Sequence, residues 1–288
     1  MATVPLTRGA RALLFVFAAI FVGCGAQSTT VSSEPNPIEL QLLRAVVEPR
    51  PVATVAPTAT TTTTTTTTTT VPPTTTIAPL GPNETLVATA TDSVPFLLAY
   101  DGPEGNIIPL PFVVPNPHQF GGPLTLRVVE GSITDEWVKV ALPVRPNGQE
   151  AWIPTDGYEL ATTTIRAEVN LSNTSVRVFD DDELIAETQA AIGAPNTPTP
   201  LGTFYVAAVR ENPPSESFLG THAIVLSAFS EVLDTFDGGL PVVAIHGTNT
   251  PEGQLGHQIS NGCIRIPNDV VAFLAEHVPP GAPVEISA

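Results

Sequence analysis

Cysteine and lysine are almost absent from this sequence of 288 residues. It has two cysteines, Cys24 and Cys263, and a single lysine, Lys139. Lysine and arginine together number 11 against 28 acidic residues, which gives a formal net charge of −17. No basic patch interleaved with aromatic residues occurs, so we expect no nucleic-acid partner. No group of His, Cys and Asp has the spacing of metal ligands, and we expect neither a metal nor another cofactor.

The first 23 residues have the pattern of a signal peptide. Two arginines precede the apolar run ALLFVFAAIFV, which is short for a membrane span. The run ends at FVGCGAQS, which resembles the bacterial lipobox and predicts lipidation of Cys24. An ordinary signal peptide with an incidental cysteine is the alternative. If Cys24 is lipidated, Cys263 has no disulfide partner. A free thiol in an exported protein needs an explanation, and catalysis is one.

Residues 24–84 are predicted to form a disordered tether. Threonine and proline dominate them, and they offer little apolar area to offset the entropy cost of ordering. Proline favours extended geometry of about 3.1 Å per residue, so about thirty such residues reach on the order of 90 Å. A low-complexity expansion with no spacing role is the alternative for the threonine run.

Residues 85–162 are predicted to form a small SH3-like β domain. Short apolar runs separated by Gly, Pro and Asn indicate strands at TLVATA, LTLRVVEG, EWVKVAL and EAWIP. Asn147 and Gly148 suit the positive φ angles of a tight hairpin turn between the last two runs. No charged cluster with obvious chemistry occurs here, so we expect packing or wall contact and not catalysis.

Residues 163–288 are predicted to form a second, β-rich domain with one late helix. The stretch TIRAEVNLSNTSVRVFDDDELIAETQ alternates apolar and polar residues across two turns, as in a meander. Further strands are expected at GTFYVAAV, THAIVLSA and LPVVAIHG. Helical spacing begins only after Asn268, a candidate cap, and ends at Pro279 and Pro280. The fold class predicted for the chain is therefore mainly β.

Cys263 and His246 are the candidates for nucleophilic chemistry. A thiol is a modest nucleophile at neutral pH, and a histidine that takes its proton activates it. His246 follows the apolar run PVVAI, so its side chain is expected at a strand end, facing a loop. Cys263 lies behind SNG, where consecutive backbone N–H groups can stabilise an oxyanion. On residue types and spacing alone, a buried core cysteine and an unrelated histidine remain the alternative.

A wider pattern resembles one enzyme family. The segments HG and SNGCIRIPND resemble the active-site signature of L,D-transpeptidases of the YkuD family, and IGAPNTPTPLGTFYV resembles a second hallmark of that family. The resemblance covers about residues 164–287. It implies a cell-envelope enzyme that cleaves the L,D bond of a peptidoglycan stem peptide, forms a cysteine thioester and transfers the acyl group to an amine. It also implies acylation by carbapenem-type inhibitors. With Cys24 lipidated, the protein is expected on the outer face of the cytoplasmic membrane, facing the cell wall.

The resemblance also implies residue roles. Cys263 would be the nucleophile and His246 the proton acceptor and donor, with the N–H groups of Gly262 and Cys263 lining an oxyanion hole. Arg265 would hold the loop or bind a carboxylate, and a salt bridge to an acidic residue is its alternative. Gly247 stands where some relatives carry serine, so a backbone carbonyl is expected to orient His246.

One position departs from the family pattern. Asn261 stands where a histidine usually precedes Gly-Cys, and an amide can donate a hydrogen bond but cannot take up a proton. Asn261 therefore suits a structural or oxyanion role, and His257 is only a fallback base. The departure keeps open a catalytically degenerate lipoprotein that binds the wall. A sortase-like enzyme is a further alternative, although no TLxTC motif is present.

Overall fold

The computed structural model describes residues 80–288. The predicted signal peptide, Cys24 and nearly all of the predicted tether lie outside the described residues. The described range is mainly β with one late α-helix, as the sequence predicts, and it forms part of one compact unit. No helix within this range is long and apolar enough to cross a membrane.

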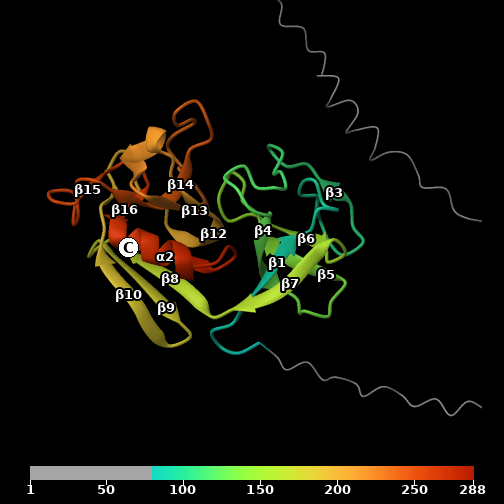
Figure 1. Cartoon of the computed structure of the whole chain (residues 1–288). Coiled ribbons are helices and arrows are strands. Elements are labelled where there is room, and N and C mark those ends of the chain that lie inside the picture. The colour runs from blue at the N-terminus through green and yellow to red at the C-terminus, as the bar shows by residue number, and fades with distance from the viewer. Residues whose placement is uncertain (1–79) are drawn as a thin grey trace, which may run out of the picture. The chain divides into compact units, whose positions relative to one another are not determined.

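Strands β1–β7 form a seven-stranded sheet of order β3-β2-β6-β5-β4-β1-β7, in which every neighbouring pair is antiparallel. Alternate residues are buried in β5, where Val138 and Val140 are fully enclosed. Figure 1 shows these strands in teal and green, apart from the yellow-to-red strands of the second sheet. The strands are β1 (Thr85–Ala90), β2 (Ala99–Tyr100), β3 (Ile107–Ile108), β4 (Thr125–Glu130), β5 (Trp137–Ala141), β6 (Glu150–Pro154) and β7 (Tyr158–Thr163).

The β5–β6 hairpin exists, and Asn147 and Gly148 form a turn as predicted, but the turn is part of a longer connection and is not a two-residue hairpin loop. Residues 142–149 connect the strands, and of the two residues only Gly148 has a positive φ, of 80°. The Asn147 side chain is used elsewhere. Its Nδ2 donates to the Phe229 carbonyl at 2.8 Å, and its Oδ1 accepts from the Phe229 N–H at 2.9 Å. This paired contact ties the first sheet to the second.

The second sheet has the order β10-β9-β8-β17-β12-β13-β14-β16. Its β17–β8 and β14–β16 pairs are parallel and its other pairs antiparallel. The predicted meander is present as β8–β10, whereas the central strand β17 was not predicted. A separate parallel pair joins β11 to β15. The strands are β8 (Ile165–Asn170), β9 (Ser175–Asp180), β10 (Glu183–Gln189), β11 (Ile192–Gly193), β12 (Gly202–Glu211), β13 (His222–Phe229), β14 (Val242–Thr248), β15 (Gln258–Ser260), β16 (Ile264–Pro267) and β17 (Pro283–Ser287).

The late helix α2 (Asn268–His277) packs on this sheet through Val271 and Leu274, which are buried. Its predicted cap is wrong: Pro267 holds the N-cap position and Asn268 is the first helical residue. The Asn268 side chain instead accepts from the Thr221 N–H at 3.1 Å, just after the 3₁₀ helix η1 (Pro214–Leu219). This contact joins the start of α2 to the segment after η1.

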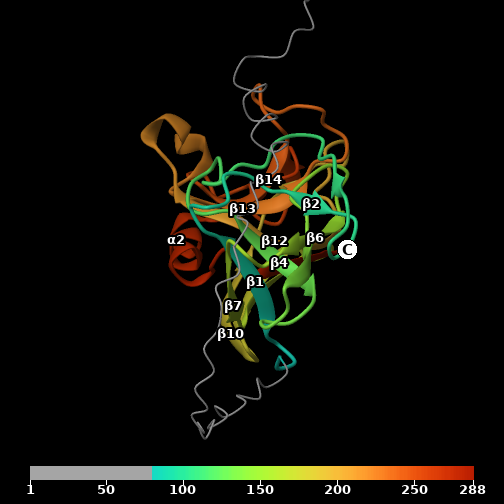
Figure 2. The ribbon, with the colours of Figure 1, turned by 90° about the vertical axis from the view of Figure 1, so that its right-hand side faces the viewer.

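Strand β12 serves the cores of both sheets. Tyr205 and Ala207 pack into the core of the first sheet, while Phe204 and Val206 pack into the core of the second. Because successive side chains of a strand point to opposite faces, one strand can contribute to two cores. Figure 2, turned by 90°, shows β12 and β4 next to one another, and contacts between these strands bear this out.

Candidate active site

Strand β14 presents His246 on the face opposite the core. Val243 and Ile245 are buried in the core of the second sheet, while Val242, Ala244 and His246 line a pocket on the other side. The period of two in the sequence VVAIH therefore places the imidazole at the pocket end of an otherwise apolar strand. His246 is itself buried, with 3% of its surface exposed.

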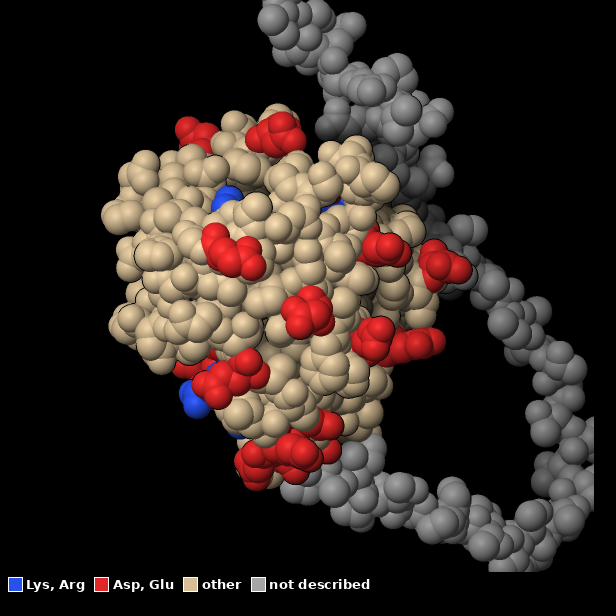
Figure 3. Space-filling view, turned by 60° about the vertical axis from the view of Figure 1, so that its left-hand side comes forward, with Lys and Arg blue, Asp and Glu red and all other residues tan. Residues whose placement is uncertain are grey.

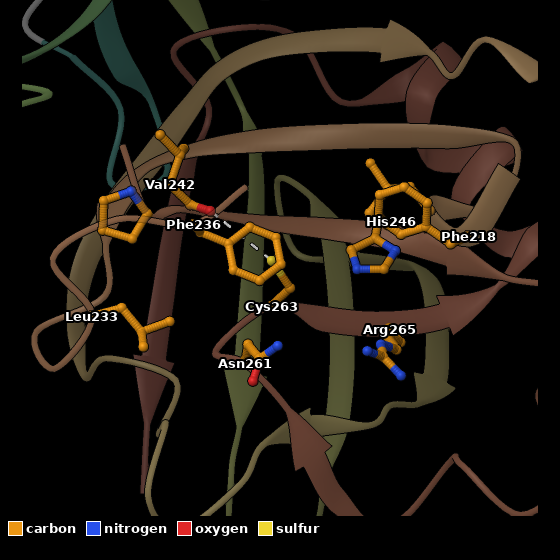
Figure 4. A pocket seen from close by; sticks show the side chains of 10 residues that line it. Phe218, Leu233, Phe236, Val242, His246, Asn261, Cys263 and Arg265 are labelled. Carbon is orange, nitrogen blue, oxygen red and sulfur yellow. Dashed lines mark hydrogen bonds between the residues drawn. The ribbon is translucent and has the colours of Figure 1, made fainter. Parts of the chain in front are cut away.

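The neighbouring strand β16 repeats this arrangement. Ile264 and Ile266 are fully buried in the core, which leaves Cys263 and Arg265 on the pocket face. The two strands are parallel, with His246 paired to Arg265 and Ile245 to Ile264. The structure thus brings together three residues that the sequence singles out. Figure 4 shows Cys263, His246 and Arg265 around one pocket, together with Asn261.

The imidazole of His246 is oriented by the backbone. Its Nδ1 lies 2.8 Å from the Gly247 carbonyl oxygen, and a carbonyl can only accept, so Nδ1 carries the proton and Nε2 is left as the basic nitrogen. Gly247 has no room for a side chain, because a Cβ would overlap Asn268 Oδ1 and lie 3.1 Å from Gly220 Cα. The orienting group is therefore a carbonyl, and a serine side chain would not fit here.

Burial lowers the pKa of His246 to about 4. The carbonyls of Gly247 and Leu219 oppose this shift, and the positive charge of Arg265 adds to it. The imidazole is consequently neutral at physiological pH. It is thus in the form that can accept a proton.

Cys263 is a half-buried free thiol. Burial raises the pKa of the Cys263 thiol, while the backbone of Ala244 and the charge of Arg265 lower it in part. The sulfur is directed toward the Val242 carbonyl oxygen at 4.0 Å, and within residues 80–288 it has no hydrogen bond to His246. The resting site therefore holds a protonated thiol and a neutral imidazole, and not an ion pair.

Arg265 makes no ion pair within the described part of the chain. Its Nη1 donates to Gln254 Oε1 at 3.0 Å, and its buried Nε has no acceptor there. The salt bridge considered for Arg265 is therefore not formed with any described residue. A guanidinium without a carboxylate partner lies at the pocket and suits a carboxylate ligand.

Two threonines of the TPTP segment hold the loop that precedes the cysteine. Thr197 Oγ1 donates to the Ser260 carbonyl and Thr199 Oγ1 to the Gly262 carbonyl, both at 2.9 Å. Both threonines are buried. The TPTP segment therefore positions the loop that precedes Cys263 by hydrogen bonds, a role that the sequence pattern does not reveal.

The backbone N–H groups of the loop differ in their availability. The Gly262 N–H donates to Ser260 Oγ at 3.2 Å, and Gly262 has a φ of 109°, which favours glycine. Among residues 80–288, the Cys263 N–H has no hydrogen-bond acceptor.

Asn261 is exposed at the pocket, whereas His257 is exposed outside it. In the described range, no group of three or more His, Cys, Asp and Glu side chains is placed to hold a metal ion.

Comparison with known proteins identifies the family to which residues 164–286 belong. The sequence model of the YkuD family, described as the L,D-transpeptidase catalytic domain, matches residues 164–286. A protein of Bacillus licheniformis named as the L,D-transpeptidase YkuD is 32% identical over 126 residues, which are 44% of this chain and 67% of that protein. The L,D-transpeptidase named YqjB of Bacillus subtilis is 30% identical over 155 residues, which are 50% of this chain and 78% of that protein.

The chain therefore belongs to the YkuD family of L,D-transpeptidases. This membership sets it apart from the sortases. Among solved structures, a cysteine-to-serine mutant of the Enterococcus faecium L,D-transpeptidase is 25% identical, with a TM-score of 0.34. That comparison covers 42% of this chain and 49% of the other.

Proposed function

We propose that the protein is a peptidoglycan L,D-transpeptidase that uses Cys263 as its nucleophile and His246 as its base. The observation that carries this proposal is the placement of Cys263, His246 and Arg265 on one face of two paired strands, at a pocket inside an L,D-transpeptidase catalytic domain. The neutral His246, and an Arg265 that pairs with no carboxylate among residues 80–288, match the needs of an acyl donor that ends in a carboxylate.

In the first step, the thiol attacks the carbonyl carbon of the L,D peptide bond. His246 Nε2 takes the thiol proton, and the Cys263 N–H stabilises the oxyanion, with Asn261 Nδ2 as a second candidate donor. The C–N bond then breaks, the proton passes from the imidazolium to the leaving amine, and a thioester remains on Cys263. Arg265 binds a carboxylate of the donor. The carboxylate of the departing terminal residue is one such group.

In the second step, an acceptor amine attacks the thioester carbon. A new C–N bond forms, the C–S bond breaks, and the amine's proton returns to the sulfur through His246. The enzyme is thereby regenerated without any other reactant. The acceptor is an amine of a second stem peptide, a protein or an amino acid.

Incubation of the mature chain with a tetrapeptide stem and an amine acceptor tests this function. We expect mass spectrometry to show loss of the terminal D-residue, a thioester adduct on the protein and a new amide product. Intact stem peptide after prolonged incubation, with no adduct on a folded protein, would contradict the proposal.

A second candidate function is wall binding without catalysis. It is favoured by the direction of the thiol, which points to the Val242 carbonyl and not to His246, and by Asn261 at the position of the usual histidine. Intact-mass measurement after incubation with a carbapenem separates the two candidates. A stoichiometric adduct on Cys263 supports the enzyme, and wall binding with no adduct supports the binding protein.

We also propose that Cys24 carries a lipid that anchors the protein to the outer face of the cytoplasmic membrane. Each buried methylene contributes about 0.8 kcal/mol and a single acyl chain anchors only marginally, so the diacyl modification expected at a lipobox is needed. Cys24→Ala is expected to abolish palmitate labelling and to release the protein from the membrane fraction. Wild-type protein that takes up no label and leaves the membrane as readily as the variant would overturn the anchor.

A further inference from the structure

We propose that the N-terminal β unit forms one wall of the acceptor site, with Phe120 as a residue that determines affinity for the acceptor. This inference rests on the proposed function. Gln119 and Phe120 lie between β3 and β4 of the first sheet, yet they line the same pocket as Cys263 and His246 of the second. The described domain that carries the cysteine therefore does not enclose this pocket by itself.

The pocket with Phe120 and the pocket with Arg265 share the catalytic pair. Cys263 and His246 line both, as do Phe218 and Phe236. Asn261 and Arg265 line only the first, whereas Phe120, Arg210 and Glu216 line only the second. The donor and the acceptor must both reach the sulfur of Cys263. The two pockets give each substrate its own route to that atom.

The segment that carries Phe120 is fixed in place. Asn116 Nδ2 donates to the carbonyls of Thr91 and Val94 at 2.9 and 2.8 Å, and Asn116 Oδ1 accepts from the Leu124 N–H at 2.9 Å. The Phe120 ring is half-buried, with the Arg210 guanidinium carbon 5.7 Å from its centroid. A wall held in this way is formed before substrate arrives.

The charges of the two pockets assign the acceptor to the Phe120 side. Arg210 is paired with Glu216 there, and Asp237 adds a second carboxylate, so acidic groups outnumber the guanidinium. On the face shown in Figure 3, Asp and Glu side chains outnumber Lys and Arg, in keeping with the 28 acidic and 11 basic residues of the sequence. An acceptor amine arrives protonated at neutral pH and is attracted by the Phe120 side. It releases one proton to solvent before it attacks the thioester as a neutral amine. The donor ends in a carboxylate, which the unpaired Arg265 attracts to the other pocket.

Two-substrate kinetics of Phe120→Ala test the assignment. At saturating donor, we expect the acceptor concentration for half-maximal transfer to rise about tenfold, which corresponds to losing about 1.4 kcal/mol of apolar contact. The rate of Cys263 acylation by the donor alone should not change. Phe120→Leu should restore most of the acceptor affinity, because leucine replaces much of the apolar surface of the ring. If Phe120→Ala lost affinity only because the loop unfolds, donor acylation at the shared Cys263 would change as well.

Val113→Ala is the matched control. Val113 lies in the same connection between β3 and β4, is 71% exposed and lines neither pocket at Cys263, so its kinetics should equal those of the wild type. If Phe120→Ala transfers with the acceptor affinity of the wild type, the N-terminal unit has no role in acceptor binding. The proposed function would be unaffected by that result. A loss confined to donor acylation would reverse the assignment of the pockets. Failure of the wild type to acylate would remove the proposed function and this inference with it.

Discussion

Replacing Cys263 by alanine is expected to abolish the covalent adduct and to lower transfer by roughly 10⁴-fold or more, because the substitution removes the atom that forms the acyl-enzyme. The fold should persist. Cys263 is half-buried at the end of a strand whose core residues, Ile264 and Ile266, are unchanged, so we expect a loss in unfolding free energy of about 1 kcal/mol or less. Intact-mass spectrometry and thermal unfolding measure the two quantities on the same samples.

Cys24→Ala is the matched control for this experiment, since it makes the same substitution at the other cysteine. It should acylate at the wild-type rate in a purified system without membranes. Cys263→Ser keeps a nucleophilic oxygen in nearly the same place, and we expect slow acylation or none, because a hydroxyl is far more weakly acidic than a thiol. An adduct that persists in Cys263→Ala would place the nucleophile elsewhere.

The placement of His246 and Cys263, the proposed catalytic pair, at two strand ends follows from local sequence patterns. In VVAIHG and CIRI, residues that face the core alternate with residues that face the pocket. This period of two puts His246 and Cys263 on the face opposite Ile245 and Ile264. The family signature supplied the pairing of these two segments. Pattern alone could not show that β14 and β16 are neighbours, because that depends on a parallel pairing between segments separated by a loop.

Two asparagine side chains make contacts that the sequence pattern does not reveal, and for the same reason. Asn147 and Asn268 have side chains that suit a turn and a helix cap, and both instead bond to backbone groups distant in sequence, Asn147 at Phe229 and Asn268 at Thr221. Short polar side chains satisfy whichever buried backbone group the tertiary fold presents. Local propensity therefore locates the hairpin and the helix, but not the use of the asparagine in each.

The central position of β17 in the second sheet likewise could not be predicted from local sequence. Its sequence PVEIS alternates like any short strand, but its place between β8 and β12 is set by the return of the chain after α2. The supports of the site, Thr197, Thr199 and Gln254, act through contacts across the fold. Only the TPTP hallmark gave a signal for any of them, and it did not reveal which groups the threonines bind.

Burial of the pair changes the pH dependence that the sequence suggests. From unperturbed values, acylation would rise with pH through a histidine-like or a lowered cysteine-like ionisation near neutrality. In the structure, the pKa of His246 is lowered to about 4 and that of the Cys263 thiol is raised, so neither group titrates near pH 7. The His246 imidazole is therefore neutral at every pH above about 5, and the free thiolate of Cys263 forms only in alkaline solution.

His246→Gln is therefore expected to change the shape of the pH profile as well as the rate. Wild-type acylation by a stem peptide or a carbapenem should be nearly constant between about pH 5.5 and 8, because a neutral imidazole removes the thiol proton throughout that range. The glutamine variant has no base and reacts only through free thiolate, so its rate should rise about tenfold per pH unit until the raised pKa of Cys263 is reached. At pH 7 we expect the acylation rate of His246→Gln to be roughly 10² to 10⁴-fold below that of the wild type, and this difference narrows as the pH increases.

Alkylation by iodoacetamide reports the thiolate alone and so supplies the pKa of Cys263 independently. His277→Gln, at an exposed helix end, is the matched control. Parallel profiles for the wild type and His246→Gln would show that His246 does not take the proton from Cys263, even if both variants are slow.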